Sequence, residues 1–311
     1  MTIKTTQLHG GTLGDVKLLE GTGMTAGGKP LPDKVVHKTQ KQWERYDDPG
    51  SWRREYDLYA SGLGGYFTDT LRWPECYHAE DHGGRIELWL EYINGTTGLD
   101  LTGDMIEQAA YELGRWQGKI YAERPAAMAK LDNLSRVSYA ERFYRHYRSW
   151  KVVFDYIRSE DCAIPKHLCD MLIQVDKTAD EIFRRIEKLP IVFCHRDFWI
   201  TNIFHTDQGI RLIDWDTSGW GYLGEDIAQL ICDEADVDHM VEYYKRCVPA
   251  YYRGFSEYVD VSHVTDDCIW ELMVTMYGYR IVEWYLDAET SQGKALQINT
   301  LQRICEMRNH E

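Results

Sequence analysis

The first 93 residues carry short runs of alternating apolar and polar positions separated by glycine-containing turns, a pattern typical of antiparallel strands. The segment Thr6–Gly21 predicts two short strands around a glycine turn, and Asp33–Thr39 predicts the next strand. Glu75–Ile93 predicts a hairpin with its turn at residues 81–84. One helix is expected between these strands, because Asp48-Pro49 offers a helix start and four side chains then recur at helical spacing before the glycines at 62–65: Trp52, Glu55, Tyr56 and Tyr59.

The spacing of apolar residues changes to a helical period after Thr102. A stripe at i, i+3 and i+4 predicts an amphipathic helix: Ile106, Ala109, Ala110, Leu113, Trp116 and Ile120. Further helices are expected at 138–157, 165–189, 226–234, 237–258, 265–288 and 294–309. The pattern therefore predicts an α+β protein, with a small antiparallel β lobe over residues 1–93 that ends at a hinge and a large, mainly helical lobe over residues 94–311.

Residues 191–216 interrupt the helical pattern with β-rich runs. Ile191–Cys194, Ile203–Phe204 and Ile210–Ile213 predict short strands, and Asp207-Gln208-Gly209 predicts the turn between the last two. The charged residues fall at the strand ends. Carboxylates at such positions can share a divalent cation, which offsets the free energy cost of burying an unpaired acid.

Two acids and an amide are so placed. Asp197 and Asn202 occupy one loop in the pattern H-x-D-x-x-x-x-N, and Asp214 follows the next hairpin. Asp and Asn oxygens suit Mg²⁺, a hard ion that takes few protein ligands and completes its shell with phosphate oxygens and water. A carboxylate that does not bind the metal can accept a hydroxyl proton. These groups predict phosphoryl transfer, in which an enzyme mainly positions the reactants and neutralises charge.

At these residues the chain resembles a known family. His195-Arg196-Asp197 with Asn202, followed by Ile213-Asp214-Trp215-Asp216, resembles the catalytic and metal loops of the aminoglycoside phosphotransferases, relatives of choline kinases and, more distantly, of protein kinases. The resemblance implies a bilobal protein kinase-like fold that uses ATP and Mg²⁺. It makes Asp197 the catalytic base, Asn202 and Asp214 the Mg²⁺ ligands, and Asp226 a brace for the backbone of the catalytic loop.

The resemblance also implies a lysine that contacts the ATP phosphates. Lys38 lies in V-V-H-K, which is similar to the V-A-I-K segment of kinases, although a solvent-facing lysine would read the same. Glu55 lies on the apolar side of the following helix, where an acid is costly unless it is paired. The resemblance supplies Lys38 as this partner, so we expect Glu55 to pair with Lys38, with Asp57 as a poorer candidate.

Two further nucleotide contacts are implied. Gly11 and Gly14 fall where a kinase glycine-rich loop places its later glycines, although His9 stands in place of the first one and an ordinary hairpin turn fits the pattern as well. The end of the second hairpin resembles the segment that leads into a kinase hinge, so adenine would be bound by backbone groups of three residues: Glu91, Tyr92 and Ile93. The composition of that segment also suits any central strand.

Two decoys are rejected. Gly23 to Lys29 satisfies G-x-x-x-x-G-K, but Pro30 replaces the required Ser or Thr and a strand follows instead of a helix. Cys194 and His195 are adjacent on a strand, so their side chains point to opposite faces and do not form a nucleophilic pair. No A-P-E segment follows Asp214, which disfavours a protein substrate.

The composition narrows the class of partner. The net charge of −15 disfavours binding to nucleic acid and to anionic membranes, and it favours a cationic partner. Eight scattered cysteines without metal spacing are typical of reduced thiols. No apolar run is long enough to cross a bilayer and the first residues lack a signal-peptide core, so a cytoplasmic protein is expected.

Two features of the last third could belong to an acceptor site. The first is a group of acids, which would more often be a solvated surface: Asp233, Glu234, Asp236, Asp238, Glu271 and Glu283. The second is an apolar stripe, which would more often be core: Trp270, Val274, Tyr277, Ile281 and Trp284. In the aminoglycoside phosphotransferases, acidic residues of this region hold cationic aminosugars.

The leading hypothesis is an ATP- and Mg²⁺-dependent phosphotransferase that moves the γ-phosphate to a hydroxyl of a small cationic molecule, which could be an antibiotic and so confer resistance. One alternative is a metabolite kinase acting on choline, a sugar or an amino alcohol. Another is a catalytically silent scaffold that binds nucleotide. The presence of the base, the metal ligands and the lysine together disfavours the silent form.

Overall fold

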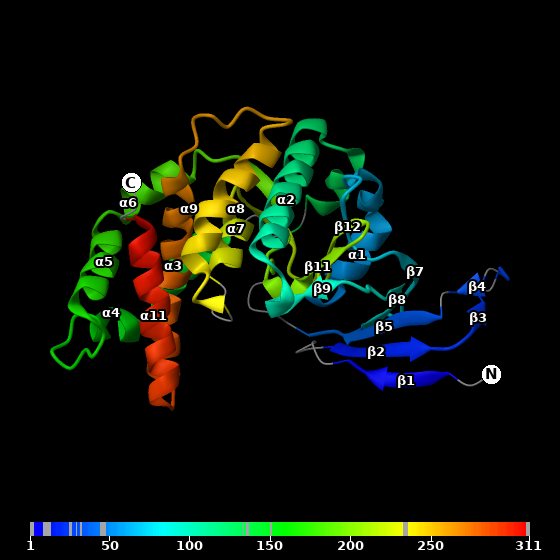
Figure 1. Cartoon of the computed structure of the whole chain (residues 1–311), viewed down its shortest axis with the longest axis horizontal. Coiled ribbons are helices and arrows are strands. Elements are labelled where there is room, and N and C mark those ends of the chain that lie inside the picture. Colours follow the sequence, from blue (N-terminus) through cyan, green and yellow to red (C-terminus); the bar gives the residue numbers. More distant parts are fainter. Residues whose placement is uncertain are drawn as a thin grey trace. The chain divides into compact units, whose positions relative to one another are not determined.

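The structure is a computed structural model that describes the whole chain except residues 1–2, 9–13, 25–26, 29, 32, 44–47, 133, 135–136, 150, 233–235 and 309–311 (Figure 1). The chain divides into two compact units. Unit 1 consists of residues 1–97, 125–133 and 202–218, and unit 2 consists of residues 98–124, 134–201 and 219–311. Unit 1 thus includes two segments that come after residue 93 in the chain.

The main sheet of unit 1 has five antiparallel strands in the order β1-β2-β5-β8-β7. Their bounds are Lys4–Gln7 for β1, Gly14–Glu20 for β2, Lys34–Lys41 for β5, Cys76–Asp81 for β7 and Arg85–Glu91 for β8. Strand β8 alternates as the sequence predicts, and its buried side chains Ile86, Leu88 and Leu90 form a core cluster with Trp52. The predicted strands and the second hairpin are therefore confirmed.

The predicted helix follows β5. It begins as a 3₁₀ turn, η1 (Ser51–Arg53), and continues as α1 (Arg54–Ser61). The expected start at Pro49 is thus two residues too early, because the first turn forms where the Ser51 N–H donates to the Asp48 carbonyl. Gly62, at φ +87°, ends the helix in the left-handed region that favours glycine.

The second sheet of unit 1 has the order β6-β12-β11-β9. Its strands are β6 (Leu71–Arg72), β9 (Thr96–Thr97), β11 (Ile203–Thr206) and β12 (Gly209–Leu212). Strands β11 and β12 form the predicted hairpin, with Ile203 opposite Leu212. Gly209 is required at the turn, because its φ is +102° and a Cβ atom there would lie 2.2 Å from the Thr70 carbonyl. Unit 1 also holds a two-stranded sheet, β3 (Gly23–Met24) with β4 (Pro30–Leu31), and the 3₁₀ turns η2 (Leu63–Tyr66) and η4 (Ala126–Leu131).

Unit 2 is mainly helical, with one two-stranded sheet of β10 (Ile191–Cys194) and β13 (Gly219–Tyr222). Its helices are α2 (Gly103–Glu123), α3 (Tyr139–Ser149), α4 (Lys151–Tyr156), α5 (Lys166–Lys177), α6 (Ala179–Ile186), α7 (Glu225–Ile231), α8 (Met240–Phe255), α9 (Asp266–Met273), α10 (Tyr279–Asp287) and α11 (Ser291–Arg308). A 3₁₀ turn, η3 (Gly98–Asp100), precedes α2, and another, η5 (Ile200–Asn202), precedes β11.

Helices α2 and α8 of unit 2 lie side by side (Figure 1). A Cβ atom on Gly114 would lie 2.2 Å from the Tyr251 carbonyl, and one on Gly254 would lie 2.1 Å from the Tyr111 carbonyl. The two backbones therefore touch at glycines on both helices, and any side chain at these positions would push them apart.

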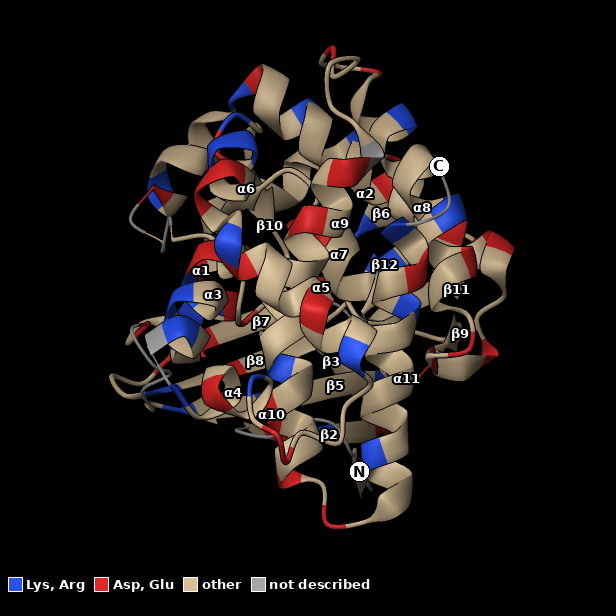
Figure 2. Cartoon of the chain, turned by 90° about the vertical axis from the view of Figure 1, so that its left-hand side faces the viewer, with Lys and Arg blue, Asp and Glu red and all other residues tan. Residues whose placement is uncertain are grey.

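Two predicted helices are interrupted. The helix expected over 165–189 is divided between α5 and α6 at Thr178, and the one expected over 265–288 contains a π-helical turn at Val274–Gly278 between α9 and α10. Acidic and basic positions lie next to each other on helices such as α6 (Figure 2). Among the described residues, no helix is long and apolar enough to span a membrane.

Candidate active site

A buried ion pair joins the main sheet of unit 1 to helix α1. The Lys38 ammonium, on β5, lies 2.7 Å from the Glu55 carboxylate and 2.7 Å from Asp214 Oδ1. Lys38 and Glu55 have only 11% and 3% of their side chains exposed. The pairing predicted for Lys38 and Glu55 is therefore formed, whereas Asp57 pairs with Arg53 at the surface.

These charges shift one another's protonation. Burial lowers the pKa of Lys38, but the carboxylates of Asp214, Glu55 and Asp216 outweigh burial and hold this pKa well above its ordinary value. Burial raises the pKa of Glu55, and the Lys38 ammonium opposes that rise. Lys38 is consequently a fixed cation at physiological pH, held in place from a strand by an acid on the neighbouring helix.

The loop after β12 is held by the same helix. Arg54, next to Glu55, is 2% exposed and donates to the Ser218 carbonyl at 2.7 Å and to Asp48 at 2.6 Å. Helix α1 thus contacts the loop at Ser218 through Arg54. Its next residue, Glu55, pairs with the lysine that contacts Asp214. Asp214 has φ +62°, a left-handed conformation that costs a residue other than glycine about 1–3 kcal/mol when the surroundings impose it.

Asn202 and Asp214 flank the β11–β12 hairpin. Asn202 immediately precedes β11, Asp214 follows β12 by two residues, and the opposed pair Ile203 and Leu212 places both at the open end of the hairpin. The Asn202 carbonyl accepts the Ile213 N–H at 3.1 Å, which closes that end.

This arrangement can accommodate a hard cation. Asp214 keeps 31% of its side chain exposed, so its carboxylate remains accessible beside the Lys38 contact. A carboxylate and an amide at one hairpin end are oxygen donors of the kind that Mg²⁺ takes when phosphate and water supply the rest of its shell. Among the described residues, no three His, Cys, Asp or Glu side chains are grouped to hold a metal alone.

In unit 2, Asp226 holds the loop that carries Asp197. The Asp226 carboxylate, 1% exposed, accepts the backbone N–H of His195 at 2.9 Å and that of Arg196 at 2.8 Å. The brace expected from the resemblance is therefore present. Arg196 has φ +64°, so the chain turns sharply just before Asp197 and the hydrogen bonds of Asp226 fix that turn.

Gln117 on α2 completes this network. Its side-chain amide donates to Asp226 at 2.9 Å and to the Phe193 carbonyl at 3.0 Å, and its oxygen accepts from the Tyr251 hydroxyl on α8. Burial raises the pKa of Asp226 to about 6, although the N–H groups of Arg196 and His195 oppose the rise. Helices α2 and α8 thus help to set the position of the loop through one buried carboxylate.

Asp197 has a neighbour that sequence reasoning missed. The Trp199 indole N–H donates to Asp197 Oδ1 at 2.6 Å, and the Asp197 N–H donates to His195 Nδ1 at 3.2 Å. The indole contact orients the carboxylate, and the His195 contact fixes the backbone at Asp197. Neither Trp199 nor Gln117 belongs to the motif, and only the sequence nearness of Trp199 to Asp197 could have drawn attention to it.

The other predicted nucleotide contacts are placed in unit 1. Gly14 begins β2, where a Cβ atom would lie 3.1 Å from the Thr39 carbonyl, and Gly11 lies outside the described residues. Glu91 ends β8, and its side chain accepts from Arg72 at 3.2 Å and from the Glu75 N–H at 2.9 Å. Tyr92 and Ile93 follow, with the Lys34 ammonium 5.0 Å from the Tyr92 ring. Their roles in nucleotide binding stay predictions.

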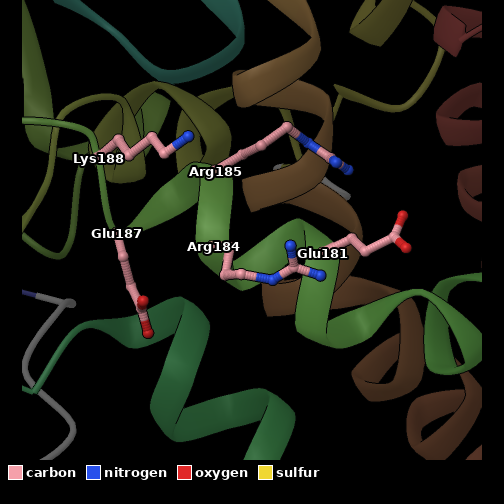
Figure 3. Close-up of a pocket in the computed structure, with 5 residues that line it drawn as sticks. All are labelled: Glu181, Arg184, Arg185, Glu187 and Lys188. Atoms are coloured by element: carbon pink, nitrogen blue, oxygen red, sulfur yellow. The ribbon is translucent and has the colours of Figure 1, made fainter.

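The apolar stripe and the acids that could belong to an acceptor site differ in their surroundings. In the apolar stripe, Trp270, Val274, Tyr277 and Ile281 are buried, so most of it is core. Of the acids, Glu271 pairs with Arg185 and Glu283 accepts from the Tyr147 hydroxyl at 2.5 Å, whereas Asp233 and Glu234 lie outside the described residues. The surface hollow in Figure 3 is lined by five residues of α6 and the turn after it, whose side chains spread apart rather than converge. It contains none of the predicted site residues.

Comparison with known proteins identifies the family. The model of the phosphotransferase enzyme family matches residues 51–257, whereas a search of curated proteins found no significant match. A choline kinase from Cryptosporidium parvum Iowa II is 15% identical, with 99% of this chain and 89% of that chain covered and a TM-score of 0.61.

Two complexes are similar at a TM-score of 0.57 and 12% identity. Amicoumacin kinase hAmiN, with AMP-PNP, Ca²⁺ and Ami, is covered over 88% of its length by 97% of this chain. APH(2")-IIia, with GDP and kanamycin, is covered over 95% by the whole of this chain. These likenesses show the protein kinase-like fold. The chain belongs to the phosphotransferase enzyme family, and it is a small-molecule kinase.

Proposed function

We propose that the protein transfers the γ-phosphate of ATP, with Mg²⁺, to a hydroxyl group of a small cationic molecule. The observation that carries this proposal is the buried contact of Lys38 with both Glu55 and Asp214. A lysine held by an acid of the first helix, next to an acid of the metal loop, is the arrangement that protein kinases need for phosphoryl transfer.

Each residue has a role in this proposal. Lys38, fixed by Glu55, aligns the phosphates, and Asn202 and Asp214 hold the metal, which neutralises the charge of the transferred group. Asp197 orients the acceptor hydroxyl and takes its proton, a contribution of about 10²–10⁴ in rate. Asp226 and Trp199 keep that carboxylate in place. Backbone groups at Gly11, Gly14 and at Glu91 to Ile93 bind the rest of the nucleotide.

Two observations support a cationic acceptor. The chain carries a net charge of −15, which attracts cations. One similar structure is a complex with kanamycin, and another is a choline kinase. The comparable likeness to both keeps a metabolite kinase as the second candidate, beside an antibiotic kinase that would confer resistance.

The test is the exchange of single acids in an ADP-release assay with a panel of aminoglycosides, choline and amino alcohols. We expect Asp197→Asn and Asp214→Asn to reduce transfer by at least about 100-fold while thermal unfolding stays cooperative. Asp207→Asn is the matched control, because Asp207 is exposed at the turn of the same hairpin. Activity near wild type in either of the first two variants refutes the mechanism. A chain that binds ATP with Mg²⁺ and phosphorylates no acceptor is the silent scaffold.

A further inference from the structure

Arg280 of unit 2 is enclosed by aromatic rings. Its guanidinium carbon lies 5.1 Å from the centre of the Phe143 ring, 5.9 Å from that of Tyr277 and 4.9 Å from that of Trp284. The rings come from α3, the π-helical turn and α10, so three elements build one box around a single cation. The side chain is half-buried, and stacking on aromatic faces is favourable for a guanidinium.

The guanidinium of Arg280 lacks a hydrogen-bond acceptor among the residues that the structure describes. Arg196 also stacks on a ring, that of Tyr139, but its guanidinium donates to the carbonyls of Val137 and Trp220. Arg280 has five N–H donors in a planar fork that matches a carboxylate. The nearby Glu283 is engaged by the Tyr147 hydroxyl. Arg280 is thus positioned but, within the described chain, not neutralised.

A chain of contacts connects this box with the catalytic base. The Tyr277 ring lies 6.1 Å from the Trp199 ring, centre to centre, and the Trp199 indole donates to Asp197 at 2.6 Å. The Tyr277 hydroxyl is fully buried, and no hydrogen-bond partner for it occurs among the described residues. Burial holds the pKa of Tyr277 well above its ordinary value; the Arg280 cation opposes this rise, and the Asp197 carboxylate adds to it.

A π-helical turn positions Tyr277 and Arg280. A π turn inserts one extra residue into a helix and often occurs at functional sites. Here it spans Val274–Gly278, so it carries Tyr277 and ends two residues before Arg280.

We propose that Arg280, with Tyr277, binds a carboxylate of the acceptor, so that the substrate class is hydroxy amino acids, which also carry the cationic group of the proposed acceptor. This inference rests on the proposed function, in which Asp197 faces the acceptor hydroxyl. A single guanidinium balances one carboxylate and forms a bidentate pair with it. Aromatic boxes can bind quaternary ammonium groups, but Arg280 already fills this one. An ammonium group elsewhere in the acceptor is compatible with the net negative charge of the chain. A hydroxy amino acid therefore has both a carboxylate for Arg280 and a cationic group.

The experiment uses pairs of acceptors that differ by a carboxylate, namely ethanolamine with L-serine and 3-amino-1-propanol with L-homoserine. In the full-length enzyme we expect kcat/KM to be about 10- to 100-fold higher for the carboxylate member, since a charged hydrogen bond is gained. Arg280→Met should bring the ratio close to one by raising KM for the acid, with KM for ATP unchanged. Arg280→Lys should retain part of the preference. Arg253→Met is the matched control, because Arg253 stacks on Tyr111 at 5.6 Å on the exposed side of α8.

Direct binding covers acceptors that are not turned over. We expect isothermal titration with O-phosphoserine and O-phosphoethanolamine to show tighter binding of phosphoserine to the wild type, and no such difference in Arg280→Met. A preference for the carboxylate-free members, equal effects of Arg280→Met and Arg253→Met, or no binding of phosphoserine each overturns the subsite. If acceptors are phosphorylated and Asp197→Asn abolishes this while Arg280→Met has no effect, the proposed function stands and only the subsite fails. Full transfer by Asp197→Asn instead rejects the proposed function.

Discussion

The replacement of Asp226 by Asn separates the role of this buried acid in the catalytic loop from its role in stability. Its two oxygens accept three N–H donors, from His195, Arg196 and Gln117, at 2.8–2.9 Å. An Asn side chain offers one oxygen, and its NH₂ group must face at least one of these donors. Gln117 cannot turn over to compensate without losing its bonds to Phe193 and Tyr251. One buried N–H is therefore left unsatisfied, at a cost of about 1–3 kcal/mol.

The neutral side chain brings an opposing gain. The pKa of Asp226 is raised from 3.8 to about 6, and one pH unit corresponds to about 1.4 kcal/mol, so ionisation at neutral pH costs the folded state about 3 kcal/mol. Asp226→Asn removes that cost. The two effects nearly cancel, and we expect the free energy of unfolding at pH 7 to stay within about 2 kcal/mol of the wild type.

Activity has no such compensation. A donor that faces an NH₂ group pushes the loop away from it, and a displacement of the base by about 1 Å costs about 100-fold in rate. The assays are urea unfolding at pH 7 and kcat by ADP release. Glu112→Gln is the control, because Glu112 is buried on α2 but pairs with Arg115, outside the base loop. A kcat for Asp226→Asn within threefold of the control would refute this reasoning.

Three further outcomes are expected. Glu55→Gln should lower kcat/KM for ATP by about 10- to 100-fold, whereas Asp57→Asn, at the surface of the same helix, should change it less than twofold; similar effects of both would contradict the role of the buried pair. Trp199→Phe should lower kcat about 10-fold without changing KM for ATP, because Asp197 loses its indole donor; an unchanged kcat argues against that contact. Since the pKa of Asp226 is raised in the folded state, its contribution is fully present below pH 4 and is lost as pH rises through about 6, so the wild type should lose about 3 kcal/mol more than Asp226→Asn over this range in urea unfolding, and equal losses would refute it.

Local patterns predicted the groups that lie close together in sequence or on one periodic face. The apolar spacing around Glu55 placed an acid in a buried position, and the family resemblance supplied Lys38 as its partner. The second contact of Lys38, with Asp214, joins residues 176 positions apart and has no local signal beyond the motif itself. The motif nevertheless predicted a carboxylate at Asp214, because phosphoryl transfer requires oxygen ligands for the metal at that position.

Other features could not be read from the chain alone. The π-helical turn at Val274–Gly278 leaves the apolar stripe continuous, so periodicity predicted one unbroken helix. Arg54 belongs to none of the motifs, and only the fold brings the Ser218 carbonyl to it. The box around Arg280 combines three elements, and its residues carry no motif that marks them together.

The ammonium of Lys38 on Asp214 has a consequence for the order in which ligands arrive. A bare divalent ion entering beside this lysine would meet the Lys38 ammonium and a carboxylate that the lysine already shares, which is a poor electrostatic balance. The triphosphate brings its own negative charge and restores it. Metal and nucleotide should therefore bind as one complex. The enzyme without nucleotide should show no binding of free Mg²⁺.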